Sequence, residues 1–454
     1  MRADLVVRSS RVLTSCGLTP AALHLLDGRI ARLASHDDCP PGVPLDDAGE
    51  LVVMPGLVDT HVHLNEPGRT DWEGFESGTA AAACGGITTL VDMPLNSVPA
   101  TTRIEALARK REAANGKLHV DVAFWGGVVP GNAAELSSLA NGVCGFKAFM
   151  VPSGVDEFPA VGESDLRAAL PILADLRLPL LVHAESPSVI EAHASLLAQG
   201  EGRSHATWLA SRPAAAETAA IALLIALCRE YRTRIHIVHL SASEALPLIQ
   251  AARAERVSLT VETCPHYLTF AAEEIHAGAT AFKCAPPIRG RSNQQRLWQA
   301  VEDRVVDLVA SDHSPCPPAM KELASGDFTR AWGGIGSIEL SLAAVWSGAS
   351  QRGMTVEDVA RLMCTQPAEL AGVGSRKGRI AEGFDADLAI WNPDAEFTVV
   401  QDALVQRHKI TPYDGLRLRG LVERTYVRGN IAFSRTDPGS LQATHGKLIV
   451  RSSA

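Results

Sequence analysis

The segment Leu57-Val58-Asp59-Thr60-His61-Val62-His63-Leu64 is a short apolar run that ends in two histidines, and it is the first of eight such runs. The other seven are Ile87–Met93, Val120–Gly126, Gly145–Met150, Leu178–Ala184, Ile235–Leu240, Val257–Thr263 and Val306–Asp312. Stretches rich in Ala, Leu and Glu separate them, and the clearest are Thr101–Asn115, Glu163–Leu176, Pro213–Tyr231 and Ser243–Glu255. Eight strand–helix units over about 300 residues predict a (β/α)8 barrel rather than an open doubly wound sheet.

The two ends of the chain differ from this middle part and resemble each other. Short strand patterns occur at Leu5–Leu13, Ala22–Leu26, Ile30–Leu33, Ala386–Trp391, Leu421–Arg428 and Ile431–Ser434. Asp27-Gly28 and Gly429-Asn430 are turn signals between neighbouring strands. We therefore predict one small β-sandwich domain made of residues 1–53 and 376–454, with the barrel at 54–375. Two unrelated β extensions would be the alternative.

Composition indicates a globular intracellular enzyme. The chain has 454 residues, of which 46% are hydrophobic, and its net charge is −9 without a basic stripe, which argues against nucleic-acid binding. The longest apolar stretch, Ala219 to Cys228, is too short to cross a bilayer, and the N-terminus lacks an apolar signal region. Nine cysteines without paired spacing are typical of reduced thiols. These features predict a cytoplasmic protein that does not bind membranes.

Histidines recur at the ends of the predicted barrel strands, where the chemistry of such barrels is found. His61 and His63 are two residues apart, so their side chains point to the same face and could share a metal ion. Alone, this pair would more often be two ordinary polar residues at a strand end. His183, His239 and Asp312 end three further strands and strengthen the metal interpretation.

Lys147 lies within the apolar run Gly145–Met150. Burial lowers the pKa of a lysine, and the neutral amine could react with carbon dioxide to form a carbamate that bridges two metals. Taken by itself, Lys147 could equally be a surface lysine with a buried stem. Together, four histidines, one lysine and one aspartate at five strand ends predict a binuclear metal centre.

Other residues after the strands are candidates for the pocket. Asn96 follows the second strand, and Ser314 begins a proline-rich loop after the eighth. For His266 we prefer a role in a loop or pocket wall to one as a metal ligand. No histidine pairs in sequence with the three cysteines nearest the site, which are therefore predicted to be buried or loop thiols: Cys264, Cys284 and Cys316.

These motifs give the chain a family resemblance. PGLVDTHVHLNEPGR, GFKAFM, LVHAE, HIVHLSAS, ETCPHYL, KCAPPIRG, ASDHSPCPPAMK and KGRIAEGFDADLAIW follow one another as in the amidohydrolase superfamily. The chain resembles the cyclic amidohydrolases of that superfamily. The stretches EPGRTDWEG, DMPLN, DHSPCPPAMK and AWGGIGS make it most similar to the allantoinase family.

The resemblance implies a mechanism. Two divalent ions would be held by His61, His63, Lys147, His183, His239 and Asp312. Zinc is the first choice, with cobalt or manganese as substitutes, and Lys147 would be carbamylated by carbon dioxide. A hydroxide that bridges the metals would attack the ring amide of allantoin to give allantoate. Asp312 would act as general base and then as general acid, and the protein would be a homotetramer.

The chain also departs from neighbouring families. Dihydroorotases usually have an arginine where this chain has Asn65, so the usual anchor for a substrate carboxylate is missing, unless Arg69 or Arg289 replaces it. Dihydropyrimidinases and hydantoinases usually have a tyrosine shortly after the carbamylated lysine, where Ser153 is the only hydroxyl here. We therefore predict that substrate contacts come from Asn65, Asn96, Ser153 and Ser314. The alternatives are a hydantoinase or dihydropyrimidinase, a dihydroorotase, and a non-catalytic scaffold, against which the six filled ligand positions argue.

Overall fold

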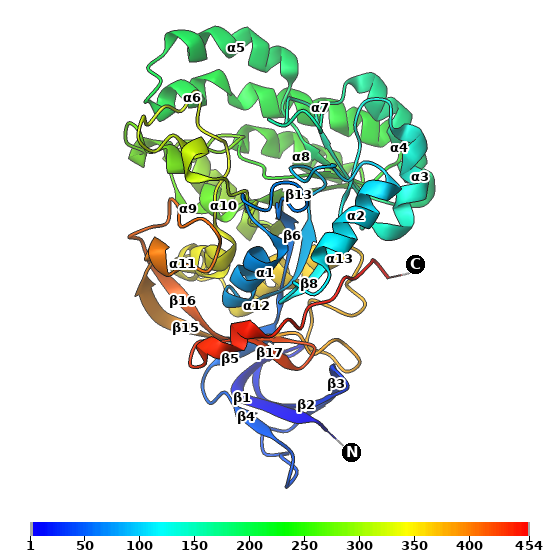
Figure 1. The fold of residues 1–454 in the computed structure, drawn as a ribbon, viewed down its shortest axis with the longest axis vertical. Coiled ribbons are helices and arrows are strands. Elements are labelled where there is room, and N and C mark those ends of the chain that lie inside the picture. Colours follow the sequence, from blue (N-terminus) through cyan, green and yellow to red (C-terminus); the bar gives the residue numbers. More distant parts are fainter. Residues whose placement is uncertain (1–2, 453–454) are drawn as a thin grey trace.

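Eight parallel strands form the barrel (Figure 1). The structure is a computed structural model and describes residues 3–452. The strands are β6 Leu57–Val62, β7 Ile87–Asp92, β8 Asp121–Phe124 continued by β9 Gly126–Gly127, β10 Phe146–Phe149, β11 Leu180–His183, β12 Ile235–Ile237, β13 Leu259–Thr263 and β14 Leu308–Val309. They pair in sequence order, and a bridge between Val62 and His313 closes the ring. The predicted (β/α)8 barrel is confirmed.

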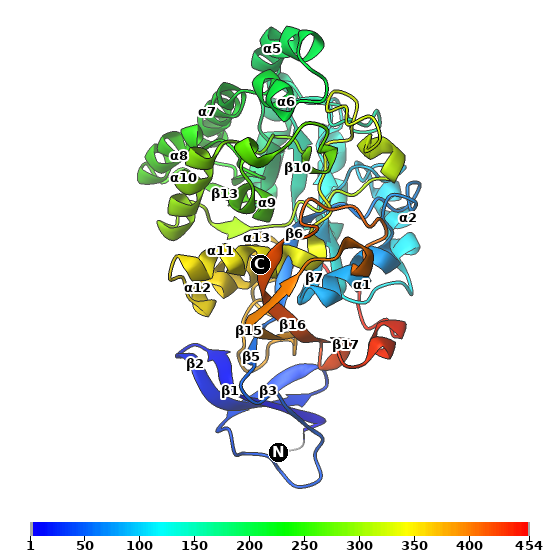
Figure 2. The same ribbon diagram turned by 90° about the vertical axis from the view of Figure 1, so that its left-hand side faces the viewer.

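Helices surround the barrel (Figures 1 and 2). They are α1 Phe75–Cys84, α2 Ile104–Ala114, α3 Leu136–Leu139, α4 Glu163–Leu176, α5 Pro187–Gln199, α6 His205–Ser211, α7 Ala214–Tyr231, α8 Leu246–Ala254, α9 Pro265–Thr269, α10 Arg291–Glu302, α11 Ser341–Gln351, α12 Val356–Ala360 and α13 Gln366–Leu370. Their apolar residues recur at helical spacing. In α7, for example, Ile221, Leu224 and Cys228 lie on one buried face.

One helical stretch of the described chain, His205–Tyr231, is long and apolar enough by composition to span a membrane. The uninterrupted apolar run inside it is short, but the average over 18 residues meets the criterion, and half of that window is buried inside the protein. A core helix of a barrel wall requires the same composition.

The strands at the two ends of the chain come together in one sheet domain, seen as blue and red strands below the barrel in Figure 1. Its strands are β1 Leu5–Thr14, β2 Gly17–Leu26, β3 Arg29–Ala34, β4 Leu45–Asp47, β5 Val52–Pro55, β15 Leu388–Thr398, β16 Arg417–Val427 and β17 Asn430–Ser434. The hydrogen-bonded order is β17-β16-β15-β5-β1-β2-β3, with β4 beside β1. The predicted β-sandwich built from both ends is confirmed, whereas the exact boundaries at residues 53 and 376 stay a prediction.

One predicted turn is correct and the other is wrong by one residue. Asp27 and Gly28 have positive φ angles of 50° and 76° between β2 and β3. Between β16 and β17, the two turn residues are Arg428 and Gly429, with φ angles of 46° and 74°, instead of Gly429-Asn430. Asn430 already pairs with Val427 as the first residue of β17. A two-residue hairpin of this kind needs two positive φ angles, and here glycine takes the second of them.

A buried cluster of charges joins the barrel to the sheet domain. Lys377 lies between three carboxylates, with its Nζ 2.8 Å from Asp121 Oδ2, 3.2 Å from Asp385 Oδ2 and 2.5 Å from Asp387 Oδ2. Arg428 also pairs with Asp121. Asp121 belongs to barrel strand β8, whereas Arg428 follows β16 of the sheet domain. The cluster therefore fixes the sheet domain against one barrel strand.

The connection between the sheet domain and the first barrel strand shows which end of the barrel carries the site. Strand β5 of the sheet domain is followed, after Gly56 alone, by barrel strand β6. A Cβ on Gly56 would lie 2.2 Å from the side chain of Thr88, so only glycine fits at this crossing. The carboxyl ends of the barrel strands therefore lie on the side away from the sheet domain (Figure 2).

Candidate metal centre

The six predicted ligands lie at the carboxyl ends of five barrel strands and are all buried. His61 is on β6 and His63 follows it, Lys147 is on β10, His183 ends β11, His239 follows β12 and Asp312 follows β14. Asp312 Oδ1 lies 3.2 Å from His61 Nε2 and 3.6 Å from His63 Nε2. The ring centroid of His239 lies 5.4 Å from that of His61 and 4.5 Å from that of His183. The fold thus gathers these side chains around one point.

Two carboxylates orient the imidazole rings of His61 and His183 by accepting a hydrogen bond from each. His61 donates through Nδ1 to Glu262, and His183 donates through Nε2 to Glu185 Oε2 at 2.6 Å. The other ring nitrogens, Nε2 of His61 and Nδ1 of His183, are then the candidate ligand atoms, and Nε2 of His61 lies 3.2 Å from Asp312 Oδ1. Histidine ligands of metals commonly donate their second nitrogen in this way, which fixes the tautomer and the ring orientation.

Three histidines of the cluster have the charge state that a metal ligand needs: His63, His183 and His239. Burial lowers the pKa of His63 to about 4 and also lowers the pKa of His183. The pKa of His239 is well below its usual value, first through burial and then through the neighbouring His183. Neutral imidazoles at pH 7 can therefore offer a lone pair to a divalent cation.

Lys147 is one of the buried polar side chains of the site whose hydrogen-bonding group is left unpaired among the residues described. It is fully buried, and its Nζ has no hydrogen-bond partner within residues 3–452. Burial lowers the pKa of Lys147 to about 8, although Asp312 and Glu262 oppose the shift. An unpaired buried amine is costly unless something else pairs with it. The site is therefore consistent with a modified, metal-binding Lys147.

The backbone is strained at two ligand positions. His239 and Asp312 have φ angles of 41° and 47°, in the left-handed region that residues other than glycine rarely adopt. Glu262 Oε1 accepts from the N–H of His239 at 3.3 Å, and Ser314 Oγ donates to the carbonyl of Asp312 at 2.7 Å. These bonds hold the strained conformations, which turn both residues out of their strands.

A cavity of about 70 Å³ lies against the ligands. Asn96, Ser153 and Ser314 line it, as do Arg212 and Trp332, which the sequence analysis did not single out as site residues. A larger cavity of about 700 Å³ adjoins it and shares part of its lining. The small cavity can accept the reacting part of a substrate, and the large one provides access.

Asn65 has a different position from the other three predicted substrate contacts. It is buried, has a φ angle of 60°, and its side-chain amide lacks a hydrogen-bond partner among the residues that the structure covers. It is not part of the lining of either cavity. Its contact with substrate stays a prediction.

Neither arginine considered as a carboxylate anchor lines the small cavity. Arg69 donates to the carbonyl of Asn96 at 2.8 Å and to Glu157 at 3.1 Å. Arg289 donates to Glu217 Oε1 at 2.6 Å. The cation in the lining is Arg212, which comes directly after α6 and carries no sequence signal that would have identified it.

His266 lies in the short helix α9 and not in a loop, because Pro265 can start a helix just after β13, and its role in the pocket wall stays a prediction. Ligand atoms of Cys264, His266 and Asp312 lie within 4.8 Å of one another, so the preference against His266 as a metal ligand also stays a prediction. Cys264, Cys284 and Cys316 are buried free thiols, as predicted. Burial raises the pKa of Cys284 to about 12 and that of Cys316 to about 11, so neither is a thiolate at neutral pH.

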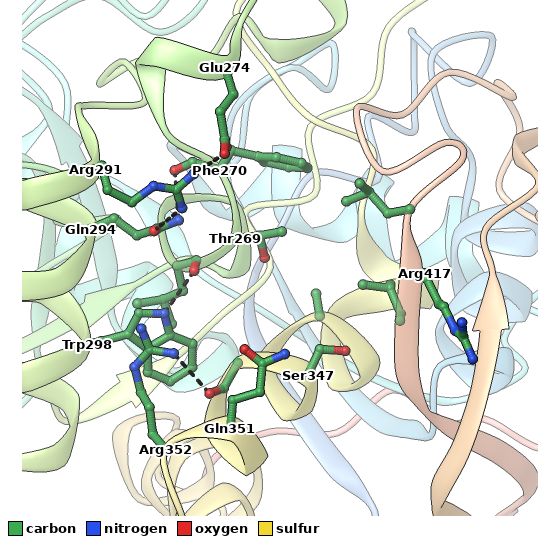
Figure 3. A pocket seen from close by; sticks show the side chains of 15 residues that line it. Thr269, Phe270, Glu274, Arg291, Gln294, Trp298, Ser347, Gln351, Arg352 and Arg417 are labelled. Carbon is green, nitrogen blue, oxygen red and sulfur yellow. Dashed lines mark hydrogen bonds and ion pairs between the residues drawn. The ribbon is translucent and has the colours of Figure 1, made fainter.

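A separate cavity of about 360 Å³ lies between α9, α10, α11 and β16 (Figure 3). Its lining contains arginines and glutamines but no histidine or cysteine. Arg291 donates to Gln294 Oε1 at 2.8 Å and pairs with Glu274, and Arg352 donates to the carbonyl of Gly348 at 3.0 Å. These polar groups are already paired, and the cavity carries no metal-ligand set.

Glu262 gives a first testable prediction. Glu262→Gln keeps the shape but weakens the hydrogen bond that orients His61. We expect metal affinity to fall about 10- to 100-fold, as for other residues that support metal ligands. Activity measured during titration of metal into chelator-treated protein reports this change. Glu255→Gln, at an exposed ion pair with Arg229, is the control, and unchanged metal affinity in Glu262→Gln would refute the role.

Known proteins resemble this chain over most of its length. The amidohydrolase family model matches residues 52–432. Allantoinase from Streptomyces avermitilis is 48% identical over 450 residues, which cover 99% of each chain. Allantoinase from Arabidopsis thaliana is 44% identical, over 94% of this chain and 87% of its own.

Solved structures agree as well. L-hydantoinase (dihydropyrimidinase) from Arthrobacter aurescens superimposes with a TM-score of 0.90 at 31% identity, over 99% of this chain and 98% of its own. Dihydropyrimidinase from Brevibacillus agri gives 0.89 at 28% identity, over 98% of each chain. The chain therefore belongs to the amidohydrolase family and, within it, to the group that contains the allantoinases.

Proposed function

We propose that this protein hydrolyses the ring amide of allantoin to give allantoate, with the help of two divalent metal ions. The observation that carries the proposal is the convergence of four imidazoles, a carboxylate and an unpaired buried amine at one barrel mouth. It occurs in a chain that is 48% identical to an allantoinase over nearly its whole length.

The ligand set suits two ions. His61, His63 and Asp312, whose ligand atoms lie within 4.8 Å of one another, would hold one ion, and His183 and His239 the other. A carbamate on Lys147 would bridge the two ions, which would also give its buried nitrogen a partner. Zinc is the first choice because it favours imidazole and carboxylate ligands, and cobalt or manganese could replace it.

Asp312 is proposed as the group that moves the proton. Divalent ions at this site supply Lewis acidity, which lowers the pKa of water and polarises a carbonyl oxygen. Burial alone would raise the pKa of Asp312, but His61, His63 and His239 hold it well below its usual value. The carboxylate is therefore ionised and can accept a proton from the attacking water. It then delivers this proton to the departing ring nitrogen.

The small cavity favours a neutral ring over a carboxylate-bearing one. Asn96, Ser153 and Ser314 contribute uncharged polar groups. Arg212, the cation there, is 3.3 Å from Glu185 Oε2, so its charge is already balanced. Hydantoinase or dihydropyrimidinase activity is the second candidate, because the solved neighbours bear those names.

A substrate panel tests the proposal. We expect kcat/KM for allantoin to exceed the values for hydantoin, dihydrouracil and dihydroorotate by at least about two orders of magnitude, since polar groups left unpaired by the wrong substrate are costly. Steady-state rates with protein that contains its metal measure this. A preference for another ring would refute allantoin as substrate while keeping cyclic-amide hydrolysis. No turnover of any ring would favour the scaffold alternative.

The proposal extends to the assembly, the location and the domains of the protein. The active form would be a homotetramer in the cytoplasm, as the family resemblance implies. Residues 1–53 and 376–454 would form one domain, and residues 54–375 the catalytic barrel. The charge cluster around Lys377, which joins the two, supports this division.

A further inference from the structure

The two adjoining cavities of the site share six lining residues, which we call the throat: Pro152, Ser153, Arg212, Ala285, Trp332 and Gly333. An occupant of the small cavity that extends toward the large one must lie against them. Two throat side chains carry N–H groups that are buried and have no acceptor in the described part of the chain. These groups are Nε of Arg212 and Nε1 of Trp332.

Trp332 is held in place from several sides. Its ring packs edge-on against Trp72, with centroids 4.8 Å apart, and its backbone N–H donates to the carbonyl of Met320 at 2.7 Å. Gly154 has a φ angle of 91° and faces the ring so closely that a Cβ would lie 3.1 Å from Cζ3. The indole therefore has little freedom to turn toward another acceptor.

The indole nitrogen of Trp332 lies beside Gly334, on the same side as Ser314. A Cβ on Gly334 would lie 3.1 Å from Trp332 Nε1 and 2.9 Å from the Cβ of Ser314, which also lines the small cavity. Trp332 and Trp72 come from AWGGIGS and EPGRTDWEG, two of the stretches that distinguish this chain from other cyclic amidohydrolases. The proposed chemistry at the metals uses neither stretch.

Arg212 forms another part of the throat. Its guanidinium carbon lies 5.0 Å from the ring centroid of Trp208, and Nη2 is 3.3 Å from Glu185 Oε2. The side chain is 11% exposed. Because Glu185 balances its charge, the unpaired Nε–H suits a neutral acceptor such as a carbonyl oxygen better than a carboxylate.

We propose that Trp332 and Arg212 form a subsite that binds the carbonyl oxygen of the exocyclic urea arm of the substrate. This inference rests on the proposed function, since allantoin is a hydantoin ring that carries such an arm. With the ring at the metals, the arm reaches the throat and pairs both donors. A ring without the arm leaves them unpaired in a buried site, which is the kind of mismatch that gives strong discrimination.

Trp332→Phe tests the subsite, because it keeps an aromatic ring against Trp72 and removes only the N–H donor and the second ring. Equilibrium dissociation constants of allantoin and of hydantoin are measured with metal-containing protein that also carries Asp312→Asn, so that the substrate is consumed only slowly. We expect the preference for allantoin over hydantoin to fall about 10- to 100-fold in the variant, the range for a buried donor left unpaired. Trp346→Phe is the matched control, because Trp346 also packs edge-on against a tryptophan, Trp391, but lies outside both cavities.

A second measurement needs no change at Trp332. In the same Asp312→Asn background, protein with Trp332 intact should bind 5-propylhydantoin, whose arm has no carbonyl, more weakly than allantoin by a similar factor. An unchanged preference in Trp332→Phe, an equal loss for both rings, or equally tight binding of 5-propylhydantoin and allantoin would overturn the subsite. Binding of allantoin without its hydrolysis by the unmutated protein would refute the proposed function instead, and the binding ratios would still decide the subsite.

Discussion

Lys147→Ala should lose bound metal and activity together. Protein purified without chelator should contain about two metal equivalents per chain, the content of a two-metal site, whereas the variant should contain close to none and show only background turnover. Only an amine can form the bridging carbamate, and alanine leaves no ligand in that position. Elemental analysis and kcat, measured on the same preparations, give both quantities.

The Lys147→Ala variant permits a rescue experiment, and the unmutated protein permits a test of pH dependence. A short-chain carboxylic acid added to Lys147→Ala should restore part of the rate by supplying the missing oxygens. In the unmutated, metal-depleted protein, a pKa of about 8 leaves roughly a tenth of Lys147 neutral at pH 7 and about nine-tenths at pH 9. Reactivation by zinc at a fixed concentration of dissolved carbon dioxide should therefore be faster at pH 9. Normal metal content and rate in Lys147→Ala would exclude the bridge.

Asp312→Asn should lower kcat by roughly 10²–10⁴, the range for a positioned acid–base group, while much of the metal is retained. Asparagine keeps one ligating oxygen but cannot accept the proton from water. Because the pKa of Asp312 is well below its usual value, the carboxylate stays ionised between pH 5 and 9, and the loss of kcat should be similar across that range. Steady-state rates between pH 5 and 9 check both expectations, together with metal analysis.

Asp303→Asn provides the control for that experiment, because Asp303 is an exposed residue that accepts only from Gln299 at 3.1 Å. It should behave like the unmutated protein. A near-normal kcat in Asp312→Asn anywhere between pH 5 and 9 would mean that another group moves the proton.

The barrel could be predicted from the sequence because each strand is a buried apolar run between helical stretches. The strand ends were less predictable. We predicted strands to Leu240 and Asp312, but β12 ends at Ile237 and β14 at Val309. His239 and Asp312 leave the strands in a left-handed conformation, which is imposed by packing around the centre and has no local pattern.

The candidate ligands could be located because strand ends of a barrel meet at one rim. The residues that orient these ligands could not be located from the sequence. Glu262 contacts His61 across 201 positions of sequence, and a single carboxylate in a strand gives no hint of its partner. Arg212 and Trp332 reach the pocket from loops, whose conformation depends on the rest of the fold.

The cluster around Lys377 has a consequence for how the protein meets a shortage of metal. Asp121, Asp385 and Asp387 are close enough together to hold a divalent ion, but the chain places its own ammonium group among them. The ion pairs that hold the barrel against the sheet domain therefore need no metal ion. We thus expect chelator-treated protein to keep the barrel and the sheet domain joined through this cluster.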